Sequence, residues 1–84
     1  MEQNQQSKTY PLRDLSLASF LLASEIVTLI RVEKKHNIVI FHFSPADKAQ
    51  TLASAYFSDR PPYIPARKLF GSRRDLQDLI FSNE

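Results

Sequence analysis

The chain is poor in the residues that build most small reactive sites. Its 84 residues include one glycine, no cysteine, no tryptophan and two histidines. A P-loop, a dinucleotide-binding turn and a nucleophile elbow each need at least two glycines, and Gly71 is the only one present. Without cysteine there is no disulfide framework, zinc finger, iron–sulfur cluster or thiol nucleophile. The fold must therefore come from packing alone, and we expect no metal ion and no cofactor.

Long apolar runs are also missing. No stretch approaches the roughly 18 apolar residues of a membrane span, and residues 1–6 are polar, unlike a signal peptide. We therefore expect a cytoplasmic protein with no membrane partner. A chain of this length buries roughly 64% of its surface on folding, which leaves a thin margin of stability. Association into a homodimer would widen that margin, and we expect one.

The first half of the chain predicts a polar tail, a helix and a β-hairpin. Residues 1–8 are rich in glutamine and read as a flexible tail. From Leu12 to Ser24 the apolar residues follow a helical period, with Asp14 as the N-cap, and the apolar arc is wide enough to face two layers or another subunit. The β-branched residues of 26–33 and 38–43 predict two strands, with a turn at 34–37 in which Asn37 tolerates positive φ.

The second half predicts two helices. Ser44, Pro45 and Asp47 fit a capping box that starts a helix running to about residue 57. Its buried stripe would comprise Ala49, Leu52, Ala53 and Tyr56. A stiff loop follows, and Pro65 starts a last helix that extends to about residue 81.

These elements predict a small α+β domain over residues 9–84. Its order is helix, hairpin, helix, helix, with the helices packed on one face of a short antiparallel sheet. A homodimer would complete the sheet or bury the first helix.

Gly71 leaves two interpretations of the last helix open. A continuous helix would place Leu69, Leu76, Leu79 and Ile80 on its core side. Alternatively, Gly71 ends a short helix and Ser72 caps a second one.

Several residues together resemble a family of small bacterial and phage-borne domains that is known only as a domain of unknown function. The resemblance covers about residues 10–82 and supports the fold and a bacterial or mobile-element setting, with no activity or ligand implied. The residues that carry it are Asp14-Leu15, Leu17-Ala18, Leu21-Leu22, Phe41-His42-Phe43, Tyr56, Pro65, Leu69-Phe70, Arg73 and Leu76.

Asp14 and Arg73 lie at apolar faces of the first and last helices, and both match that family. We predict that they form an ion pair joining the two helices; the alternative is an N-cap and a separate solvated arginine. The histidines have no helpful neighbours: His36 lies beside two lysines and His42 on a strand face with Ile38 and Ile40, so ordinary, partly exposed side chains are expected. No catalytic residue is predicted.

The last helix carries the predicted binding surface. On one continuous helix Arg67, Phe70, Arg74 and Phe81 lie within about 60° of one another. Cations interleaved with aromatic residues suit an unidentified protein partner. The alternative is that Phe70 and Phe81 pack against the first helix or against the helix that carries Tyr56, and that the arginines are only solvated.

We therefore predict a non-catalytic binding or adaptor protein that recognises a macromolecule through this helix. A second possibility is a nucleic-acid-binding or regulatory protein that uses its basic cluster. The cluster consists of Arg60, Arg67, Lys68, Arg73 and Arg74.

Overall fold

The structure, a computed structural model, describes residues 8–58 and 60–82. It confirms an α+β domain with three helices and a three-stranded antiparallel sheet of order β1-β3-β2. The predicted tail, apart from Lys8, lies outside the described residues. The elements are β1 (Tyr10–Leu12), α1 (Leu15–Ser24), β2 (Thr28–Lys35), β3 (Ile38–Ser44), α2 (Ala46–Tyr56) and α3 (Ala66–Ser82).

A first strand, β1, replaces the predicted start of the first helix. Tyr10 pairs with Phe43 and Leu12 pairs with Phe41, so the prediction of a helix from Leu12 is wrong. Three residues are too few to show an alternating pattern, and Pro11 is tolerated because β1 is an edge strand. β3 thereby becomes the central strand, which explains why Phe41 and Phe43 are its most buried residues.

The first strand of the hairpin is shifted by two residues from the prediction, which wrongly started it at Ile26, and the turn is shorter than predicted. β2 starts at Thr28 and pairs as far as Lys35 opposite Ile38. The turn has His36, not Asn37, in the left-handed region, with φ 59°. A register irregularity between Leu29 and Arg31 interrupts the pairing of β2 with β3.

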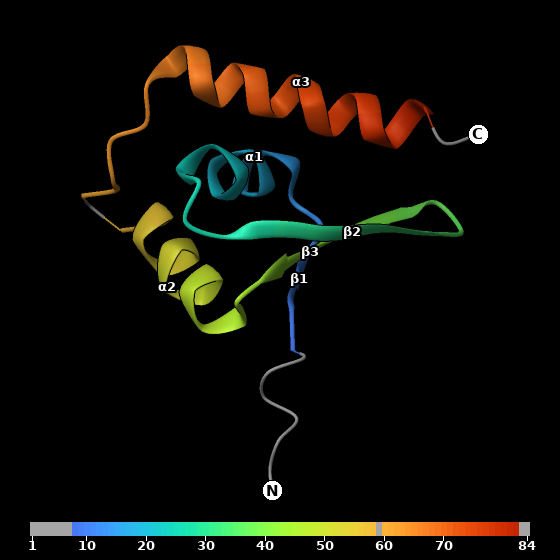
Figure 1. The fold of residues 1–84 in the computed structure, drawn as a ribbon, viewed down its shortest axis with the longest axis horizontal. Helices are drawn as coiled ribbons and strands as arrows, with labels where there is room; N and C mark the ends of the chain where they lie inside the picture. The colour runs from blue at the N-terminus through green and yellow to red at the C-terminus, as the bar shows by residue number, and fades with distance from the viewer. Residues whose placement is uncertain (1–7, 59, 83–84) are drawn as a thin grey trace, which may run out of the picture.

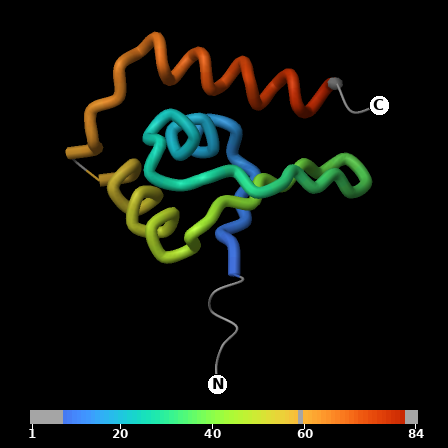
Figure 2. Tube along the Cα trace, in the orientation of Figure 1, coloured from blue at the N-terminus to red at the C-terminus, as the bar shows by residue number. Residues whose placement is uncertain are grey.

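Helix α1 lies between two layers. In Figures 1 and 2 it runs between α3 and the sheet, and it contacts α3 and α2. Leu17, Ala18, Phe20 and Leu21 are all buried, so the wide apolar arc is covered within one chain. Asp14 is the N-cap as predicted, and its carboxylate accepts hydrogen bonds from the N–H groups of two residues in the first turn.

Helix α2 has the predicted buried stripe but not the predicted cap. Ala49, Leu52 and Ala53 are buried, and Tyr56, the fourth residue of the predicted stripe, is half-buried. Ser44 pairs with Thr28 at the end of β3, so it does not cap the helix, and Pro45 occupies the N-cap position without a side-chain hydrogen bond. The capping-box prediction is therefore wrong, because α2 begins one residue later than the box requires and Ser44 ends β3 instead.

Helix α3 is continuous through Gly71, as the first of the two interpretations predicts. Leu76 is fully buried, as predicted. Leu79 is 43% exposed, so its predicted place in the core is wrong. Two contacts hold the ends of α3: Lys34 Nζ donates a hydrogen bond to the carbonyl of Ile80, and Lys68 pairs with Glu25 at 3.1 Å. None of the described elements covers the side of α3 turned away from α1 (Figure 1).

Candidate functional site

The predicted binding residues of α3 are all exposed. We call Arg67, Phe70, Arg74 and Phe81 the outer face of α3. Phe70 is 67% exposed and Phe81 is 70% exposed, so most of each side chain is open to solvent and is not packed against α1 or α2. At 1.5 Å per residue, these two rings are separated by roughly 16 Å along the helix. Arg67 and Arg74 lie on the same side of the helix and are also exposed.

Gly71 lies beside this outer face. A Cβ atom added to Gly71 would meet no atom within 4 Å, so neither packing nor a turn requires glycine there. The backbone at this position is open to solvent.

The predicted basic cluster does not form one continuous patch. Lys68 is engaged with Glu25, and Arg73 points to the side of α3 that faces α1. Arg67 and Arg74 have no carboxylate within 4 Å among the described residues. Arg60 is exposed in the loop before α3.

The predicted ion pair between Asp14 and Arg73 is not formed. Asp14 Oδ1 accepts the N–H groups of Ser16, at 2.8 Å, and Leu17, at 3.3 Å. Arg73 Nη1 instead donates to Ser16 Oγ at 3.4 Å. The carboxylate is thus committed to capping α1, and the arginine reaches the same helix through a neutral hydroxyl.

Arg73 lines a groove where the three helices meet. The groove has a volume of about 170 Å³. Tyr56 forms part of its wall, and its ring lies 5.1 Å from Phe20 and 4.9 Å from Phe57 between ring centroids. We call this the Arg73 groove, lined by Ser16, Ser19, Tyr56, Leu69, Phe70 and Arg73.

His42 differs from its prediction as a partly exposed side chain. It is 7% exposed, because neighbouring side chains cover it on the sheet face opposite to Phe41 and Phe43. Its Nε2 atom lies 2.9 Å from Glu33 Oε1, and its Nδ1 atom lies 3.2 Å from Thr9 Oγ1. The hydrogen bond from His42 lowers the pKa of the Glu33 carboxyl below its ordinary value. Alternation within single strands could not reveal this cluster, because its members come from three separate segments.

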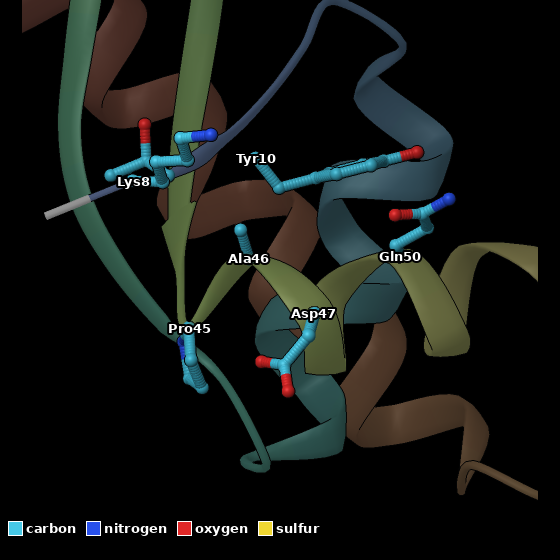
Figure 3. A pocket seen from close by; sticks show the side chains of 7 residues that line it. Lys8, Tyr10, Pro45, Ala46, Asp47 and Gln50 are labelled. Carbon is cyan, nitrogen blue, oxygen red and sulfur yellow. The ribbon is translucent and has the colours of Figure 1, made fainter. Parts of the chain in front are cut away.

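A larger, open cavity of about 670 Å³ lies between β1 and the start of α2 (Figure 3). Its lining includes Tyr10, Pro45 and Gln50, and its charged side chains, Lys8 and Asp47, are both exposed. Because one of these side chains is basic and the other acidic, the cavity favours neither anions nor cations.

In the part of the chain that the structure describes, no three histidine, aspartate or glutamate side chains gather as a metal site would require.

No described helix combines the length and the apolar character needed to cross a membrane.

Comparison with protein-family models, curated proteins and solved structures finds no match for the chain. The resemblance to the family of small bacterial and phage-borne domains therefore stays a prediction.

Proposed function

We propose that this protein is a non-catalytic binding protein that recognises a protein partner through the outer face of α3. The observation that carries the proposal is the exposure of Phe70 and Phe81 on one side of a single helix. Aromatic side chains contribute much of the energy of protein interfaces, and arginine is enriched beside them. Arg67 and Arg74 are the arginines beside these rings, and neither has an acidic partner among the described residues.

A protein partner fits this surface better than a nucleic acid. Asp75 and Asp78 are exposed near the arginines of α3 and would repel a phosphate backbone. Lys68 is paired with Glu25, which reduces the charge available for phosphate contacts.

Partner capture tests the proposal. The immobilised chain is incubated with extract of its source cells, and the retained proteins are quantified by mass spectrometry. The double variant Phe70→Ser/Phe81→Ser should lose a specific partner. Phe57→Ser, which removes an equally exposed ring (69%) outside α3, should retain it. Equal capture by the wild type and the double variant would contradict the proposal.

The nucleic-acid alternative has its own test. Binding to generic DNA and RNA is measured by gel shift at low and moderate salt, with Arg67→Glu/Arg74→Glu as the control. Phosphate contacts make affinity fall steeply with salt. We expect no such binding; a salt-sensitive shift that the charge reversal abolishes would favour the alternative.

We also propose a homodimer that forms through the free edge of β2. This strand lies at the edge of the sheet and is paired only with β3 within the described chain. Covering α1 with a second copy is unnecessary, because α3 already packs on it. Sedimentation at high micromolar concentration should give the mass of a dimer, and a clean monomer would refute this assembly. A cytoplasmic location and a bacterial or mobile-element origin complete the proposal and rest on the sequence.

A further inference from the structure

Arg73 is a half-buried cation with few of its hydrogen-bonding groups satisfied. A guanidinium carries five N–H donors. Among the described residues Arg73 makes one side-chain hydrogen bond, the long one to Ser16 Oγ, and no carboxylate lies within 4 Å of it. A charge that is partly withdrawn from water is costly unless a partner compensates it. The donors of Arg73 are therefore available to an acceptor other than the described residues.

The other polar groups of the Arg73 groove suit an anion. Ser16 and Tyr56 line the groove, and each carries a hydroxyl that is able to donate a hydrogen bond. Ser19 is occupied, since its hydroxyl donates to the Leu15 carbonyl at 2.7 Å. No acidic side chain belongs to the lining. The groove thus offers one positive charge and neutral donors.

The rest of the lining suits an apolar group beside the anion. Leu69 and the rings of Phe70 and Tyr56 form apolar walls. Packing against Phe20 braces Tyr56, so its wall is supported from within the domain. The volume of about 170 Å³ corresponds to several water molecules at roughly 30 Å³ each, which is room for a small group.

We infer that the Arg73 groove binds a carboxylate that adjoins an apolar group, as an acidic side chain beside an apolar one in the protein partner would present it. A single guanidinium matches the single charge of a carboxylate, and planar pairing lets it donate two parallel hydrogen bonds. The inference rests on the proposed function of α3 and adds to it the chemistry of the partner. Phe70 belongs to both surfaces and joins the groove to the outer face.

The test uses small probes and the isotope-labelled full chain. 3-Phenylpropionate carries a carboxylate near an aromatic ring, and 3-phenylpropionamide is its neutral counterpart. Amide chemical shifts are followed by NMR during titration with each probe. We expect saturable shifts at Ser16, Tyr56 and Arg73 with the carboxylate, and binding of the amide about tenfold weaker, because the charge-assisted hydrogen bonds are lost.

Variants assign the effect to Arg73. Arg73→Gln should abolish the preference for the carboxylate, and Arg73→Lys should reduce it by removing the planar pairing. Arg74→Gln removes a neighbouring charge on the outer face and should leave the preference unchanged. The amide chemical shifts of each variant away from the groove should match those of the wild type, which checks that the variant is folded.

Three outcomes would overturn the inference. These are equal binding of the two probes, equal weakening by Arg73→Gln and Arg74→Gln, or tighter Arg73-dependent binding of inorganic phosphate than of the carboxylate. If the probes fail while capture of a partner still depends on Phe81 and Arg74, the proposed function stands and only the groove inference fails. If capture shows no dependence on the outer face, the proposed function fails independently of the probe titrations.

Discussion

Glu33 and His42 are joined by a short polar contact across neighbouring strands, with 2.9 Å between Glu33 Oε1 and His42 Nε2. If Nε2 donates to the carboxylate, Nδ1 of a neutral imidazole is an acceptor for the Thr9 hydroxyl 3.2 Å away. The imidazole thus links β2 and β3 to the residue preceding β1. This arrangement satisfies a polar side chain that is 7% exposed on the sheet.

The contact makes stability depend on pH. The hydrogen bond from His42 lowers the pKa of Glu33 below its ordinary value of 4.5. A depressed carboxyl pKa contributes stability above the pKa of the unfolded chain, and this contribution is lost as the pH falls through the folded pKa. Glu33→Gln should therefore be less stable than the wild type near neutral pH and should lose less stability on acidification. Urea unfolding between about pH 6 and pH 3 measures the difference.

His42→Gln provides the control for this prediction. If the histidine causes the lowered pKa, Glu33→Gln should change the pH dependence much less when His42 is already replaced. An equal change in both backgrounds would show that other charges are responsible.

Asp14→Ala should destabilise the domain by about 1 kcal/mol, because two N–H groups at the start of α1 lose their acceptor. Asp14 and Arg73 do not pair, but both contact Ser16, so the loss in the double variant should differ from the sum of the losses from Asp14→Ala and Arg73→Ala by no more than about 1 kcal/mol. Asp78→Ala, an exposed substitution on α3, serves as a control and should change stability by less than about 0.5 kcal/mol. Denaturant unfolding measures the stability of all four variants. A double variant whose loss departs strongly from the sum of the single losses would support an ion pair between Asp14 and Arg73.

Gly71→Ala should stabilise the protein by about 1 kcal/mol. Alanine favours the helical conformation over glycine by that amount, and nothing within 4 Å opposes the added methyl group. Thermal or urea unfolding provides the measurement. A loss of stability would show that the backbone at Gly71 does not tolerate a side chain. Reduced partner capture by this otherwise stable variant would show that a partner approaches the helix closely at Gly71.

Leu76→Ala should destabilise the domain by about 2–5 kcal/mol, because Leu76 is fully buried and its loss opens a cavity. Leu79→Ala removes the same atoms from a side chain that is 43% exposed, and it should cost less than about 1.5 kcal/mol. Urea unfolding of the two variants compares them directly. Equal losses would mean that α3 packs through a different side.

Local signals in the sequence determined much of the secondary structure. Asp14 caps α1, the stripe around Leu52 lies inward on α2, and α3 starts just after Pro65. Each signal depends on residues within a few positions along the chain, where capping and helical periodicity act. The exposed position of Phe70 and Phe81 follows from the same periodicity once α3 is continuous.

The tertiary structure alone decided the strand pairing and the partners of the polar side chains. β1 forms by pairing with β3, where Tyr10 lies opposite Phe43. Ser44 is the last residue of β3 and pairs with Thr28 of β2, so it lies in the sheet and not at the predicted cap. Arg73 reaches Ser16 and His42 reaches Glu33 and Thr9 across long separations in sequence. Such contacts depend on which segments pack together, because a strand pairs through its backbone and a polar side chain bonds to whatever acceptor packing brings near. The sequence by itself therefore determined where most helices begin and which sides they bury, and only packing decided which polar side chains contact one another.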